Sequence, residues 1–191
     1  EPRLVCGDRY GKVRICDPVA GGEALLVILV GGGEVKALVV FEDLATGAPR
    51  LALGSEHGKV CVFDPVTGGE ALIMLEVGEE VKALAVFIDP ATGAPRLVCA
   101  SGKKVLVFDP VVGGDALLVL DISSEALTIF TEPATGAPRL ACGYDDEKVL
   151  VFDAVSGGDA LLELDACDEV SALIAFEDLM TGAPRLRSSR R

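Results

Sequence analysis

Carboxylates are the side chains of this sequence best placed to do chemistry. The chain has 30 Asp and Glu residues against 17 Lys and Arg, which gives a formal net charge of −13 at pH 7. Paired carboxylates can serve as the acid and base of a glycosidase. Such a site also needs aromatic platforms, whereas this chain has seven Phe, two Tyr and no Trp. A hydrolase of this kind is therefore the remote alternative, and we expect a protein that is not an enzyme and needs no cofactor.

The single histidine, His57, is the only residue that could act as a base near neutral pH. It lies in the turn Ser55-Glu56-His57-Gly58, beside a serine and a glutamate. Equivalent turns elsewhere carry Tyr10, Lys103 and Asp146 instead. His57 is therefore interpreted as an interchangeable turn residue, and no catalytic triad is expected.

Metal, phosphate and nucleic-acid chemistry find little support. Calcium needs six to eight oxygens, and Asp145-Asp146-Glu147 is a weak signal without a D-x-D-x-D-G loop. Gly58-Lys59-Val60 lacks the spacing of a phosphate-binding loop and leads into a strand. The acidic charge argues against nucleic acid. No apolar run reaches the roughly 18 residues that span a bilayer, so no membrane partner is expected.

The six cysteines form no C-x-x-C pair, which argues against a zinc site. Cys6, Cys99 and Cys142 stand at the same place in successive sequence repeats. Equivalent positions on stacked sheets lie about 10 Å apart, too far for a disulfide. We expect buried thiols, and hence a reducing intracellular, cytoplasmic location.

The elements that must position these groups are repeated. Pro-Arg-Leu begins at residues 2, 49, 95, 138 and 184, at intervals of 47, 46, 43 and 46 residues. A period in the forties with strand-like sequence indicates a propeller or solenoid. The expected organisation is one array over residues 1–186, with units at about 2–48, 49–94, 95–137 and 138–183, followed by a disordered basic tail at 187–191.

Each unit contains four strand patterns separated by turns. In the second unit these are residues 50–54, 59–64, 71–75 and 81–87, with Asp64-Pro-Val-Thr-Gly-Gly69 as one of the turns. The third and fourth strands are apolar on both faces, which favours stacked sheets over a two-sheet sandwich. The fold class expected is an all-β propeller of four-stranded antiparallel blades.

The motif Gly-Lys-Val-x-Val-Phe-Asp, followed by a Pro-x-x-Gly-Gly turn, resembles the WD40 family of β-propellers. Phe63-Asp64, Phe108-Asp109 and Phe152-Asp153 stand where that family has Trp-Asp, and the Gly-His of the family is absent. The resemblance implies that the Val-Lys-Ala-Leu strand is innermost and the Ala-Leu-Leu strand outermost in each blade. It also implies a platform that binds proteins.

The ends of the array are complementary in this arrangement. Counted from the innermost strand of a blade, the Pro-Arg-Leu strand is the second of four, so the chain opens on a second strand. It closes on an innermost strand, Val170–Phe176, which is expected to have no further strands of its own. Joining the ends within one chain gives a four-bladed ring, and joining two chains gives an eight-bladed ring. The blade angles of the family favour the homodimer. The monomeric ring and a fragment of a longer array remain alternatives.

In a propeller, the loops leading into the innermost strands share a face with the turns between the second and third strands. Carboxylates concentrate in both sets of loops, so we expect an acidic face that binds a basic peptide or protein. A purely structural or engineered assembly with no ligand is the alternative. We call the expected binding residues the acidic loop face: Glu34, Glu56, His57, Glu79, Glu80, Glu125, Asp145, Asp146, Asp168 and Glu169.

The repeated arginines Arg3, Arg50, Arg96 and Arg139 begin the second strands, on the opposite face. We expect them to pair with carboxylates of neighbouring turns, such as Asp43, Asp89 and Glu132.

Overall fold

In the computed structural model of the chain, residues 1–31, 33–144, 147–166, 169–177 and 184–189 are described, and all regular structure in them is β-strand. The strands form five antiparallel sheets. Along the chain they are β1 (Leu4–Gly7), β2 (Lys12–Cys16) and β3 (Leu26–Leu29); β4 (Val35–Asp43), β5 (Ala48–Ser55), β6 (Lys59–Phe63) and β7 (Ile73–Glu76); β8 (Val81–Ile88), β9 (Pro95–Ser101), β10 (Lys104–Phe108) and β11 (Leu118–Leu120); β12 (Ala126–Thr131), β13 (Pro138–Tyr144), β14 (Lys148–Asp153) and β15 (Gly157–Asp165); and β16 (Ala172–Glu177) with β17 (Pro184–Ser189).

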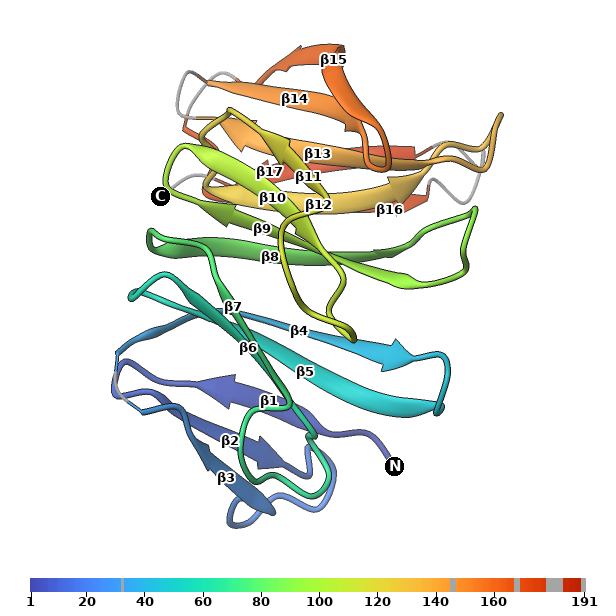
Figure 1. Ribbon diagram of the computed structural model, residues 1–191. Helices are drawn as coiled ribbons and strands as arrows, with labels where there is room; N and C mark the ends of the chain where they lie inside the picture. Colours follow the sequence, from blue (N-terminus) through green and yellow to red (C-terminus); the bar gives the residue numbers. More distant parts are fainter. Residues whose placement is uncertain (32, 145–146, 167–168, 178–183, 190–191) are drawn as a thin grey trace.

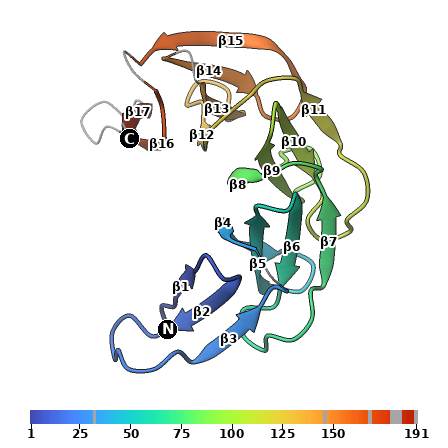
Figure 2. The same ribbon diagram turned by 90° about the vertical axis from the view of Figure 1, so that its left-hand side faces the viewer.

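The five sheets are stacked in chain order (Figure 1), and the stack curves into an arc (Figure 2). Seen along the other direction, the innermost strands β4, β8, β12 and β16 lie on the concave side, and β3, β7, β11 and β15 lie on the outside (Figure 2). Strand order within each complete sheet follows the chain, from innermost to outermost. The all-β class and the four-stranded blades predicted from the sequence are thus confirmed.

Strand register repeats from blade to blade. Phe41 faces Arg50 across β4 and β5, and Phe87 faces Arg96 across β8 and β9. The leucine that follows each of these arginines, Leu51 or Leu97, is fully buried. Because side chains alternate along a strand while the blade is covered on both faces, neighbouring residues of the second strand can all be buried. This explains the continuous apolar runs.

The two end sheets have fewer than four strands, and residues of β1 are more exposed than their equivalents in complete blades. Leu4 in β1 is 52 % exposed, although its equivalents in the three complete blades are 0 % exposed. Cys6 is exposed, whereas Cys99 and Cys142 are buried, and burial raises the pKa of each of these two thiols to about 12. The expectation of a buried Cys6 is therefore wrong for the single chain, because no blade covers β1 on its open side. The described cysteines are all free thiols.

The C-terminal end differs from the sequence-based expectation in two ways. Four repeats were expected, with a lone innermost strand at the end, but the chain forms a fifth sheet in which β17 pairs with β16. This strand runs through Ser189, so three residues of the expected disordered tail are ordered against β16. The physical reason is that backbone pairing requires no apolar side chains, and β16 has a hydrogen-bonding edge to satisfy.

Arginines of the second strands tie each blade together on the face opposite the acidic loops. Arg96 contacts Asp89 at 3.3 Å in the preceding turn and Asp109 at 2.8 Å at the end of β10. Asp109 also accepts hydrogen bonds from the backbone N–H groups of Val111 and Val112, which closes the next turn. The expected pairs of the repeated arginines with Asp43, Asp89 and Glu132 are confirmed.

The carboxylates of this network are stabilised in their charged form. A hydrogen bond from the Ala91 N–H, then one from the Thr92 hydroxyl, and the charge of Arg96 hold the pKa of Asp89 below its usual value. A carboxyl whose pKa is lowered by folding stabilises the protein above its unfolded-state pKa of about 4. That contribution is lost as the pH falls through the folded-state pKa.

We predict that Arg96→Ala lowers the free energy of unfolding by about 2 kcal/mol at pH 7, because it removes charge-assisted hydrogen bonds to two poorly exposed carboxylates. Urea unfolding measures the change. The matched control is Arg3→Ala in the exposed first sheet, which should cost less than half as much. Equal losses for both variants would contradict the role given to the buried network.

Candidate protein-interaction face

A ladder of charges runs across the beginnings of the innermost strands. Lys36, Lys82, Glu125 and Ser171 occupy equivalent positions in four successive sheets. The Lys36 ammonium lies 2.9 Å from Glu34 in its own sheet and 3.0 Å from Glu80 in the next. Lys82 pairs with Glu125 in the sheet that follows. Opposite charges thus connect neighbouring blades on the concave side.

These side chains surround a polar hollow of about 570 Å³. Its lining consists of Lys36, Glu80, Lys82, Glu125, Glu169 and Ser171. Hydrogen bonds to the carboxylates of Glu34 and Glu80 raise the pKa of Lys36, which therefore stays charged at neutral pH. Three carboxylates and two ammonium groups line the hollow, which leaves a small excess of negative charge.

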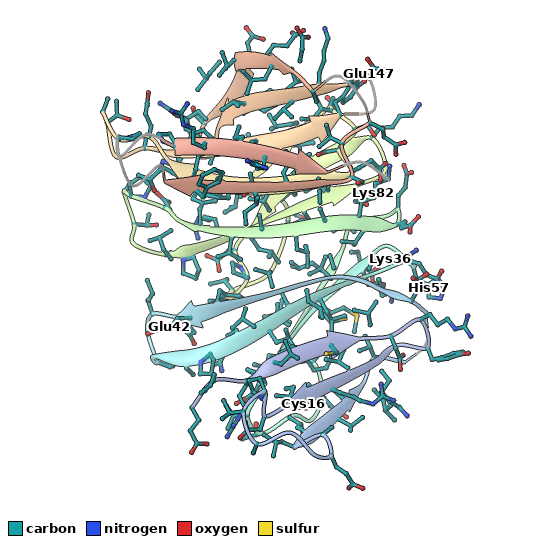
Figure 3. The ribbon with its side chains drawn as sticks, turned by 180° about the vertical axis from the view of Figure 1, so that it is seen from behind. Cys16, Lys36, Glu42, His57, Lys82 and Glu147 are labelled. Carbon is teal, nitrogen blue, oxygen red and sulfur yellow. The ribbon has the colours of Figure 1, made fainter. Side chains whose placement is uncertain are left out.

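The turn between the second and third strands of the second sheet contacts the loop that leads into β4. The Glu56 carboxylate accepts a hydrogen bond from the Glu34 N–H at 2.9 Å. His57 is 4.0 Å from the Glu56 carboxylate, and its side chain is 64 % exposed. Figure 3 shows Lys36, Lys82, His57 and Glu147 along one side of the molecule, and Glu42 on the other. The two sets of loops therefore form one continuous face.

The predicted residues of the acidic loop face have unequal surroundings. Glu34, Glu80 and Glu125 form ion pairs with lysines. The Glu56 carboxylate accepts a hydrogen bond from a backbone N–H. The backbone carbonyl of Glu79 accepts a hydrogen bond from the Ser101 hydroxyl at 2.6 Å. Asp145, Asp146 and Asp168 lie outside the described residues. The rest come together on one side of the arc.

Sequence analysis missed Lys36 and Lys82 as members of this face. Both belong to the Val-Lys-Ala-Leu motif, which was used only to identify the innermost strands. The signal was present, because each lysine directly follows a Glu-Val pair at the position where the strand leaves the loop. The lysines neutralise part of the face, and any basic ligand must compete with them for Glu80 and Glu125.

Other chemistry finds no further support in the described residues. No group of three or more His, Cys, Asp or Glu side chains in that part of the chain could hold a metal ion. The same residues include no helix long and apolar enough to cross a membrane.

The chain is an array of β-propeller blades, and this face is its charged loop surface. No family model matches the sequence, and no curated protein matches it. Solved structures do match it, at low identity, and the likeness shows the fold alone.

Three of these structures illustrate the similarity. The computationally designed protein Ika8 matches with a TM-score of 0.68 and 22 % identity over 99 % of this chain and 56 % of its own. A chain of the mitotic checkpoint complex matches with a TM-score of 0.72 and 20 % identity over 90 % and 50 %. Sqt1 of Saccharomyces cerevisiae matches with a TM-score of 0.71 and 14 % identity over 96 % and 57 %. The chain thus spans about half the length of the solved chains that it matches.

We predict that Lys82→Glu destabilises the protein by about 1 kcal/mol, because it places two carboxylates side by side between neighbouring blades. The double variant K82E/E125K restores the opposite charges and should recover at least half of the loss. Thermal or urea unfolding at low ionic strength measures both. A double variant that is as unstable as the sum of its single changes would show that the pair does not couple the blades.

Proposed function

We propose that this chain is a non-enzymatic interaction scaffold that binds a basic segment of a protein partner at the acidic loop face. The observation that carries the proposal is the polar hollow on the concave side, where carboxylates outnumber lysines. A basic segment would take the place of the intramolecular lysines at Glu80 and Glu125. These two carboxylates would therefore keep a cationic partner when the segment binds. The likeness to a chain of the mitotic checkpoint complex supports an assembly role.

The free thiols of the described cysteines support a reducing, intracellular compartment for this scaffold. Two chains of this length would together complete one ring of eight blades, since the incomplete sheets lie at opposite ends of the arc (Figure 2). Such a homodimer would present two equivalent copies of the face around a two-fold axis.

A titration with a short peptide of alternating lysine and glycine tests the binding proposal. Saturable binding should be weakened about threefold by Glu80→Gln at low salt, and less at high salt, because screening reduces the loss of one favourable charge in the hollow. Glu42→Gln is the matched control, because it removes one exposed carboxylate on the opposite side of the molecule.

Three outcomes are distinct for this titration. Weakening confined to Glu80→Gln supports the proposed face. Equal weakening by Glu42→Gln would mean that peptide binding depends only on the net charge of the protein. No saturable binding by any variant would leave the structural assembly with no ligand as the better account of the protein.

Absolute mass in solution tests the two-chain ring. Light scattering on a size-exclusion column should give about twice the mass of one chain, because the apolar ends are covered only in the pair. A mass equal to one chain at all concentrations would contradict the eight-bladed ring. The peptide titration remains informative in either case, because the hollow lies within a single chain.

A further inference from the structure

Strands β1 and β17 are equivalent in sequence and in place. Both begin with Pro-Arg-Leu, the tripeptide that opens the second strand of each complete blade. β17 pairs with the innermost strand β16, whereas β1 is the edge strand of its sheet, at the position where an innermost strand would pair. One four-stranded blade has room for only one of them, so the two strands compete for the same partner.

The register supports this competition. Phe176 faces Arg185 across β16 and β17, as Phe87 faces Arg96 in a complete blade. Because β1 has the same order of residues, it fits beside β16 in the same register. In that arrangement Cys6 stands opposite Leu173, the position that Ser188 now occupies.

The composition shows that β1 fits the site better than β17 does. The two residues after the leucine are fully buried and apolar in every complete blade: Ala52-Leu53, Val98-Cys99 and Ala141-Cys142. β1 supplies Val5-Cys6 at these positions, and β17 supplies Arg187-Ser188. Arg187 is exposed, since a guanidinium cannot be buried there without a partner. β17 packs Leu186 against the core of the neighbouring blade, but Arg187 and Ser188 replace the two apolar residues that follow, so β17 completes that core only in part.

The Gly-Gly turns give independent evidence that the N-terminal sheet and the last complete blade fit each other. A Cβ placed on Gly68 would lie 3.0 Å from Leu26 of the preceding sheet, and one on Gly157 would lie 2.8 Å from Leu118. Each Gly-Gly turn thus packs on the outermost strand of the sheet before it. The equivalent turn at Gly21 has nothing within 4 Å. Leu162 in the outermost strand of the last complete blade corresponds to Leu26 and Leu118, and it is 51 % exposed.

A hollow of about 630 Å³ adjoins this exposed strand, and its apolar lining includes Val151, Leu161 and Leu162. By analogy with the Gly-Gly contacts of the complete blades, the third and fourth strands of a complete fifth sheet would cover this strand. The sheet β1–β2–β3 consists of a second, third and fourth strand, so it is the missing portion in both number and order.

We propose that β17 is a stand-in strand that β1 of a second copy displaces, so that β16 of one chain and β1–β2–β3 of the other form a shared four-stranded blade. This inference rests on the two-chain ring proposed above and adds that assembly requires strand exchange. β17 protects the edge of β16 in the single chain and lowers the apparent affinity of the two chains, because it must leave before they join.

A cross-link tests the exchange directly in the full chain. Facing residues of antiparallel strands have Cα atoms about 4.5–5.5 Å apart, within the range of a disulfide. Mild oxidation of the variant L173C should therefore link it to Cys6 of the partner subunit, giving a covalent dimer on a non-reducing gel. The control variant L173C/C6S should stay monomeric on that gel.

Two measurements keep the test decisive if L173C folds poorly. In the unaltered chain, alkylation of Cys6 should slow at least tenfold as the protein concentration rises into the dimer range, while buried Cys99 and Cys142 stay unlabelled throughout. The variant R187V makes β17 more like β1 and should raise the dimer dissociation constant about tenfold, because a buried valine holds β17 in place.

Failure of the exchange is distinguishable from failure of the ring. A dimer by mass that gives no cross-link and leaves Cys6 as reactive as in the monomer would overturn the exchange and leave the dimer standing. A monomer by mass with an internal cross-link between positions 6 and 173 would overturn both, in favour of a ring closed within one chain.

Discussion

The structure depends on one requirement: each apolar sheet must be covered on both of its faces. Residues such as Leu51, Leu97 and Leu140 are fully buried in the second strands, although neighbouring residues point to opposite faces. A single four-stranded sheet cannot bury both faces, so each blade gains its core only from the blades beside it. The stability of the array is therefore a property of its interfaces, and the weakest places are its ends.

The same requirement organises the polar groups. The faces between complete blades are apolar, and the two networks of charged side chains described above lie at the rims of the blades. On one rim, arginines such as Arg96 connect the turns within a blade. On the other rim, Lys36 and Lys82 connect one blade to the next. The first set fixes the shape of the repeat, and the second lies on the surface available to a partner.

The incomplete ends connect stability with assembly. β1 carries apolar residues that no blade covers in the single chain, and β17 covers β16 while contributing only Leu186 to the neighbouring core. A chain of this kind has its own repeated interface available at both ends, and the proposed binding face lies between them on the concave side. The proposed scaffold and the proposed strand exchange thus follow from separate parts of one architecture.

The sequence by itself determined the repeat, the all-β class and the pairing of Arg96 with Asp89, because these depend on local patterns that recur at a fixed interval. It also placed Glu34 and Glu56 on one face. The order of strands within a blade came from the resemblance to a known family. Only the tertiary structure decided that Lys36 reaches Glu80 in another blade, that Cys6 is exposed, and that β17 pairs with β16. Each of these depends on which sheets become neighbours and on which sheets have no neighbour on one side. The sequence could not show this, because a repeat has the same local pattern whether it is buried or exposed.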